Sequence, residues 1–340
     1  MRLAGERRAI GAAVLGVFFL YYGSGVLMGM PTGAEGLMLY ALIGGYGLAF
    51  LALVAGYRLA KPISLAILVL GLVRGALDVG GGIDEPMMLY LGLHAVGLLS
   101  LLGKSDLAYI KIVGERRAVA TMVLAFYALF YAFYAYLMGP PLGRMLAALA
   151  GVYGLAFFAL VAGYFWARWF GVGVSLFGVI QGAVGLWQLG PEPIILFLGA
   201  THLFATLSLW GGAMAVPYDG QTAWREKFHM DDNAVQRLGR SVIRAGVSLP
   251  MVLLYALAPK PEAGALVALV LAVGGLAGII RMRTWGVLAL GAAGVMLLAM
   301  GGEEAVVDGG LTAAPLMAGT LLVSAAIPFV SGMRAMLKRA

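Results

Sequence analysis

Apolar stretches follow one another along the whole chain, and each is long enough to cross a bilayer as a helix, which takes about 20 residues. Short turns that carry charges, glycine or proline separate these stretches. The twelve predicted spans are 9–30, 36–57, 62–80, 86–103, 118–138, 145–166, 170–189, 192–213, 241–258, 263–281, 284–300 and 311–331. This pattern predicts an all-α, polytopic integral membrane protein with about 12 transmembrane helices.

The charges of the loops alternate in sign along the chain. Every second loop is basic, as at Arg58, Arg168 and Arg281, whereas the intervening loops are mostly acidic, as at Asp84 and Glu192. Because basic loops stay on the cytoplasmic side, we expect a multi-pass protein of the cell membrane with cytoplasmic N and C termini. The net charge of +7 then reflects membrane topology, and nucleic acid is not an expected partner.

Two segments of the chain occur twice. The sequence Gly-Glu-Arg-Arg-Ala at 5–9 recurs at 114–118, and the segment 46–57 recurs at 153–164 with a single difference. Matches of this length predict a duplicated unit, here of four spans. An even number of spans returns the chain to the same side, so the copies are expected to have parallel orientation.

A third, degenerate copy is predicted from the same four-span rhythm in the last part of the chain. The expected domains are repeat 1 at 1–113, repeat 2 at 114–216, a linker at 217–240 and repeat 3 at 241–340. We therefore expect three tandem four-helix repeats.

The linker mixes apolar and charged residues, which predicts an amphipathic segment on the cytoplasmic face of the membrane. Its apolar members are Trp224, Phe228, Val235 and Leu238. Asp231 or Asp232 is expected to cap the helix that follows, because aspartate is a favoured N-cap residue.

Few polar groups lie inside the predicted spans, and ionisable ones are costly there. Arg74 and Asp78 have the i, i+4 spacing of an ion pair, and His94 lies at a similar depth in the next span. In the second copy Gln181 stands for Arg74 and His202 for His94, with Gln188 nearby. The candidate ligand-binding residues are therefore Arg74, Asp78, His94, Gln181, Gln188 and His202.

A purely structural role for these groups is the main alternative, with Arg74 paired to Asp78 and the histidines hydrogen-bonded between helices. A second alternative makes His94 and His202 the axial ligands of one haem b, because imidazole is a common iron ligand. The chain has no cysteine, which excludes disulfides and thiolate ligands. No catalytic residue is predicted, no cofactor is required, and no other metal site is identified.

The four-span unit resembles DoxX-like small four-helix membrane proteins, on the basis of Gly44-Gly45 early in the second span and Arg74 in the third. The resemblance implies a compact four-helix bundle for each repeat and little about activity. We expect a transporter-like protein, or one that binds a small molecule or lipid within the bundle. The alternatives are a haem- or quinone-associated redox subunit and a non-catalytic scaffold, with the bilayer, other membrane subunits or a second copy as partners.

Overall fold

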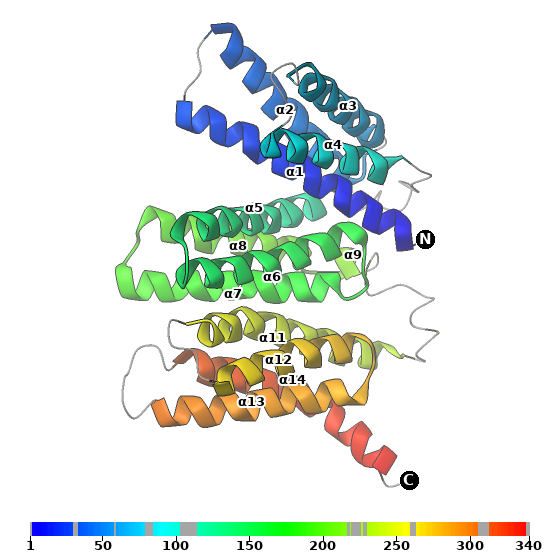
Figure 1. The fold of residues 1–340 in the computed structure, drawn as a ribbon. Coiled ribbons are helices and arrows are strands. Elements are labelled where there is room, and N and C mark those ends of the chain that lie inside the picture. The colour runs from blue at the N-terminus through cyan, green and yellow to red at the C-terminus, as the bar shows by residue number, and fades with distance from the viewer. Residues whose placement is uncertain are drawn as a thin grey trace. The chain divides into compact units, whose positions relative to one another are not determined.

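The computed structural model describes residues 2–29, 33–57, 59–78, 84–102, 114–215, 218, 226, 230–258, 263–304 and 313–337. Within these residues every regular element is a helix and there is no strand. Twelve helices have 17 to 28 residues, and α9 (Gly212–Ala215) is a single turn. The long helices, drawn in Figure 1, are α1 (Arg2–Gly29), α2 (Gly33–Ala55), α3 (Ala60–Asp78), α4 (Glu85–Leu101), α5 (Gly114–Met138), α6 (Leu142–Ala162), α7 (Ala167–Leu189), α8 (Pro193–Leu209), α11 (Asp232–Ala256), α12 (Ala263–Ile280), α13 (Thr284–Glu304) and α14 (Ala313–Leu337).

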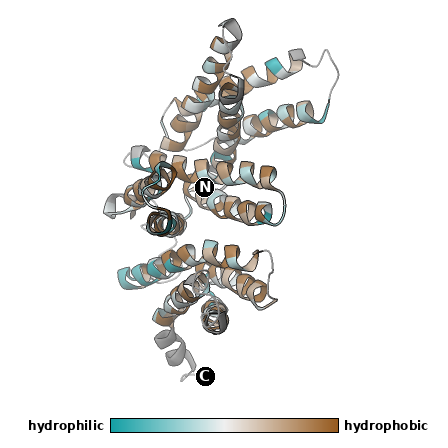
Figure 2. Ribbon diagram, turned by 90° about the vertical axis from the view of Figure 1, so that its left-hand side faces the viewer, coloured by the Kyte–Doolittle hydropathy of each residue, from teal (hydrophilic) through white to brown (hydrophobic). Residues whose placement is uncertain are grey.

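Most of the described long helices have the length and apolarity of membrane spans. Eight of them, α1, α2, α5, α6, α7, α11, α12 and α13, contain a described apolar stretch of 18 or more residues. Helices α4 and α8 and part of α14 are apolar but shorter. Hydrophobic residues follow one another along most of the ribbon (Figure 2). The prediction of an all-helical membrane protein is confirmed at this level, while the number of 12 transmembrane helices stays a prediction.

The chain forms two compact units. One comprises Met1–Ala125 with Phe157–Tyr164, and the other comprises Phe126–Ala156 with Phe165–Ala340. The division passes through α5 and α6, so these units do not coincide with the three expected repeats.

In the first unit, α1 to α4 form a closed arrangement of four helices. Helix α1 packs against α2 and α4, and α3 also packs against α2 and α4. Small residues permit the close contact between α2 and α3: a Cβ on Gly45 would lie 2.8 Å from Cδ1 of Ile67, and Ala49 is fully buried. These small residues of α2 therefore serve packing, as expected where hydrophobicity does not drive helix association.

The C-terminal end of α6 is held by two buried arginines of the same unit. Arg8 donates from Nη2 to the carbonyl oxygen of Val161 at 2.6 Å, and Arg117 donates to the same oxygen at 2.7 Å. The last carbonyls of a helix have no partner within it, and the arginines supply one. Each is the second arginine of a Gly-Glu-Arg-Arg-Ala segment, whereas the first, Arg7 or Arg116, is exposed.

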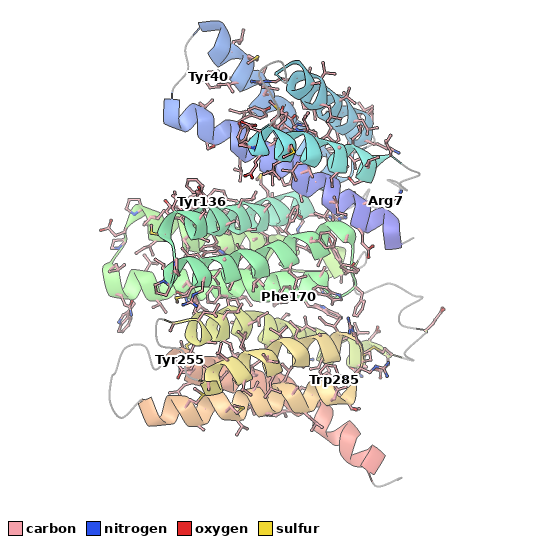
Figure 3. The ribbon with its side chains drawn as sticks, viewed as in Figure 1. Arg7, Tyr40, Tyr136, Phe170, Tyr255 and Trp285 are labelled. Atoms are coloured by element: carbon pink, nitrogen blue, oxygen red, sulfur yellow. The ribbon has the colours of Figure 1, made fainter. Side chains whose placement is uncertain are left out.

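In the second unit, α11 packs against α12 and α14, and α13 packs against the same two helices. The helices α11 to α14 therefore form a closed arrangement of four helices. Helix α7 packs against both α8 and α11. The contact of α7 with α11 is close because it is formed by two glycines, Gly173 and Gly246. A Cβ on Gly173 would lie only 2.9 Å from Cα of Gly246. The side chain of Phe170, labelled in Figure 3, is fully buried beside this contact.

Helix α11 begins inside the predicted linker, nine residues before the predicted span. Asp231 is its N-cap and accepts a hydrogen bond from the backbone N–H of Ala234 at 2.7 Å, so the predicted aspartate cap is confirmed. Val235 and Leu238 are buried while Arg237 beside them is exposed, which makes this part of the linker amphipathic. The other two predicted apolar residues, Trp224 and Phe228, lie outside the described residues.

Candidate functional site

His94 of α4 is completely buried, and both of its ring nitrogens are hydrogen-bonded. Nδ1 lies 2.8 Å from the carbonyl oxygen of Tyr90, and Nε2 lies 2.6 Å from the hydroxyl of Tyr46. A carbonyl oxygen can only accept, so Nδ1 carries the proton and Nε2 of the neutral ring accepts from Tyr46. The two bonds fix both the tautomer and the orientation of the imidazole.

Side chains from the other helices of the bundle enclose this ring. Phe18 of α1 lies against it, with ring centroids 3.8 Å apart. On the α3 side the ring occupies the space left by Gly71, where a Cβ would overlap both His94 and the Tyr46 hydroxyl. All four helices of the first bundle therefore meet at His94.

The second unit repeats this arrangement around His202 of α8, where residues of α5, α6, α7 and α8 meet; these four helices are called the second bundle. Nε2 of His202 lies 2.8 Å from the hydroxyl of Tyr153, and Nδ1 lies 2.8 Å from the carbonyl oxygen of Leu198. The ring centroid of Tyr127 lies 4.1 Å from that of the imidazole. Tyr127 thus takes the place that Phe18 has in the first bundle. A Cβ on Gly178 would overlap the imidazole, as one on Gly71 does in the first bundle.

The helices α13 and α14 have leucines where α7 and α8 have the glycine and the histidine of the second bundle. Gly294 of α13 approaches Gly319 of α14 so closely that a Cβ on Gly294 would lie 2.8 Å from the Gly319 carbonyl oxygen. Gly182 of α7 approaches Gly199 of α8 in a similar way. Counting from that contact, Leu290 takes the place of Gly178 and Leu322 the place of His202, and both leucines are buried. An apolar pair therefore fills the space that a glycine and a histidine fill in the second bundle.

Arg74 lies at the edge of the first histidine cluster. Its guanidinium carbon is 5.6 Å from the ring centroid of Tyr22, a cation–π contact. The hydroxyl of Tyr22 in turn lies 2.8 Å from the hydroxyl of Tyr90, whose backbone carbonyl holds His94. Arg74 and His94 thus belong to one aromatic cluster, while the side chain of Asp78 lies outside the described residues.

The two glutamines do not join the second histidine cluster. Gln181 and Gln188 are both exposed on α7, whereas Thr201 of α8 reaches the cluster through a 2.8 Å hydrogen bond with the hydroxyl of Tyr127. The second bundle therefore has no buried counterpart of Arg74, and the two bundles share the histidine and tyrosine but differ at this position.

The geometry does not fit haem ligation by the histidines. Axial ligation requires an unengaged ring nitrogen, and in His94 and His202 one nitrogen is held by a backbone carbonyl and the other by a buried tyrosine hydroxyl. Within the described residues there is also no group of three or more histidine, aspartate or glutamate side chains able to hold a metal ion.

Sequence reasoning missed several residues of these clusters, among them Tyr46, Tyr153, Gly71 and Gly178. The repeat itself contained the signal, because Tyr46 and Tyr153 are the first residues of the duplicated segment 46–57 and 153–164. The glycines are separated by 107 positions (178 minus 71), the same spacing as the tyrosines (153 minus 46). The recurrence of a tyrosine, a glycine and a histidine in both copies was therefore visible in the sequence, whereas the contact between them is shown only by the structure.

Comparison with known proteins gives no relative for this chain: no protein-family model, curated protein or solved structure matches it. The fold and the clusters define a helical membrane protein with two enclosed tyrosine–histidine pairs, the first of which has Arg74 at its edge. The resemblance to DoxX-like proteins stays a prediction.

Proposed function

We propose that this protein binds a lipid-like small molecule with an anionic head group within its first four-helix bundle, at Arg74. The observation that carries the proposal is the position of Arg74, partly buried in the apolar helix α3 with its guanidinium over the Tyr22 ring. A charge within a membrane span is costly and by default indicates function. Arginine in particular suits a carboxylate or phosphate, which its planar set of N–H donors matches.

The difference between the two histidine clusters supports this assignment. Both bundles contain the buried histidine, its tyrosine and the facing glycine, so these groups serve the packing of a four-helix unit. Only the first bundle has an arginine beside this cluster, and the residue of the second that matches Arg74, Gln181, is exposed. Binding is therefore assigned to the feature that one bundle has and the other lacks.

The tyrosines around Arg74 suit the boundary between a head group and its acyl chain. Tyr22 and Tyr90 pair through their hydroxyls at 2.8 Å, and Tyr21 next to them is 60% exposed. A tyrosine has an apolar ring and a polar hydroxyl, so it can contact both parts of an amphiphile. The exposure of Tyr21 supports access to the site from the lipid side of α1.

The expected topology would place this site in the outer half of the membrane. Arg74 follows the start of α3 at Ala60 by 14 residues, or about 21 Å along the helix. If the basic loops are cytoplasmic, α3 begins on that side and Arg74 lies beyond the middle of the bilayer. Three tandem repeats with both termini in the cytoplasm are part of this proposal. The matched geometry of His94 and His202 supports the duplication of the first four-span unit, and the alternating charges of the loops support the topology.

A binding titration tests the proposal. Delipidated protein in detergent is titrated with fluorescent phosphatidylglycerol and, separately, with phosphatidylcholine of the same acyl chains and label. We expect preferential binding of phosphatidylglycerol, and an affinity at least about tenfold lower in Arg74→Gln, since a charged hydrogen bond contributes about 1.5–3 kcal/mol. Arg240→Gln, at an exposed position of α11, is the matched control and should bind as the wild type does. Equal binding of the two lipids, or unchanged affinity in Arg74→Gln, overturns the proposal.

A transporter-like activity is the extension of such a site, because parallel repeats can enclose a path through the membrane. The same Arg74→Gln variant in liposomes, with the flux of the labelled lipid between leaflets as the readout, separates transport from binding alone.

A non-catalytic scaffold is the second candidate function. It is favoured by the enclosure of both histidines, whose ring nitrogens are fully engaged by the protein itself. A scaffold would retain its assembly with other subunits in Arg74→Gln and would show no lipid preference, so the titration above also separates these two candidates.

A further inference from the structure

Helix α7 changes its surroundings along its length. Its buried residues lie between positions 167 and 182, where α11 packs against it through the contact of Gly173 with Gly246. In the outer segment of α7, residues 181–189, most side chains are exposed, among them Gln181, Trp187 and Gln188. The outer segment of α7 is therefore not covered by α11.

With α7 crossing the bilayer and ending at its surface, Gln181 is a polar group at the depth of the hydrocarbon core. It precedes the end of α7 at Leu189 by eight residues, or about 12 Å, whereas half of the hydrocarbon core is about 15 Å thick. Its carboxamide makes no hydrogen bond in the part of the chain that the structure describes. Acyl chains offer no hydrogen-bonding group, and an unsatisfied amide is strongly disfavoured in hydrocarbon.

We infer that the outer segment of α7 is the contact between two copies of this chain, with Gln181 of one copy hydrogen-bonded to Gln181 of the other. Two copies in one membrane share their orientation, so a two-fold axis along the membrane normal brings the same residue of each to the same depth. A carboxamide both donates and accepts, so it can pair with its own copy, which an arginine cannot do.

Neighbouring residues on this face fit the same contact. Val184 and Gln188 follow Gln181 by three and seven residues and lie on its side of the helix. Val184 is 42% exposed and would supply apolar packing between the levels of Gln181 and Gln188. Gln188 lies one residue before the end of α7 and would repeat the pairing near the membrane surface. Glutamine side chains that hydrogen-bond across helices are an established source of association in membranes.

Cysteine cross-linking tests this inference directly, because the chain has no cysteine of its own. The variant Val184→Cys is oxidised in native membranes and analysed on a non-reducing gel. The matched control is Val270→Cys on α12, whose position is 70% exposed and outside the inferred contact. We expect a disulfide-linked dimer of the chain from Val184→Cys and none above background from Val270→Cys.

The role of the carboxamide is tested by the association constant of labelled protein in liposomes, measured by single-molecule photobleaching at several dilutions. We expect Gln181→Leu to lower this constant about fivefold to thirtyfold, as the loss of an interhelical amide pair in a membrane implies. Gln181→Asn, which keeps the amide group, should retain most of the wild-type association constant. The inference is overturned if Val184→Cys cross-links no more than Val270→Cys, if it cross-links to a protein of another size, or if Gln181→Leu associates as the wild type does.

Discussion

The hydroxyl of Tyr46 lies 2.6 Å from Nε2 of His94, and the hydroxyl of Tyr153 lies 2.8 Å from Nε2 of His202. Each pair joins the second helix of a bundle to its fourth helix. The four side chains are less than 1% exposed, so these hydrogen bonds act in a medium of low dielectric constant, where they are strong and where their loss is costly. The tyrosine–histidine pair is thus a repeated element of the bundle interior.

Removal of either tyrosine hydroxyl should destabilise the protein. In Tyr46→Phe or Tyr153→Phe, Nε2 of the buried histidine loses its donor, and we expect a loss of about 1–3 kcal/mol in the free energy of unfolding. Thermal unfolding in detergent measures the change. Tyr40→Phe, at a position that is 54% exposed (Figure 3), is the control. A melting temperature equal to that of the control would contradict a structural role for the pair.

The glycines that face the histidines should not accept a side chain. Gly71→Ala and Gly178→Ala place a Cβ against the imidazole, and overpacking of this kind costs about 1–3 kcal/mol. Gly44→Ala, whose Cβ meets no atom within 4 Å, should instead be neutral or more stable, because alanine favours a helix by about 1 kcal/mol over glycine. Equal unfolding temperatures for Gly71→Ala and Gly44→Ala would rule out the close fit.

The two arginines at the end of α6 should act together. Arg8 and Arg117 share the carbonyl oxygen of Val161, so either one alone still satisfies it. We expect the double variant Arg8→Met/Arg117→Met to lose more stability than the sum of the single variants, by about 0.5–3 kcal/mol. Chemical denaturation of all four proteins measures this coupling, with the exposed Arg7→Met as control. Strict additivity would show that the arginines act independently.

The N-cap of α11 gives a fourth test. Asp231→Ala removes the acceptor for the backbone N–H of Ala234 and should lower stability by about 0.5–2 kcal/mol. Asn233→Ala, at an exposed position in the first turn, should have little effect. If the two variants unfold alike, the hydrogen bond of Asp231 contributes nothing measurable.

The fold was predictable from the sequence where apolarity alone decides it. Most predicted spans agree with the helices within a few residues, because membrane helices are marked by long apolar stretches. The start of α11 was not predicted correctly, because the predicted span begins at 241 and the helix begins at Asp232. Its first turns are amphipathic, with Val235 and Leu238 buried and charged residues beside them, so overall apolarity does not reveal them.

The candidate site was predictable only in part. Arg74, His94 and His202 were identified because polar groups are rare in the spans, and the structure places the first two in one aromatic cluster. Tyr46 and Tyr153 were not identified, because a tyrosine in an apolar helix has the same pattern whether it fills a core or holds a histidine. Gln181 was expected beside His202 and is exposed instead, since its direction depends on how α7 packs against α8.

The most direct test of the proposed lipid site is photochemical cross-linking with a phosphatidylglycerol that carries a photoreactive group near its head. If Arg74 binds the head group, the modified residues should lie in the peptides that contain Tyr22 and Tyr90, which the structure places beside it. This labelling should be lost in Arg74→Gln and retained in Arg240→Gln. Labelling of those peptides that persists in Arg74→Gln, or that is spread evenly over all helices, would contradict a site at Arg74.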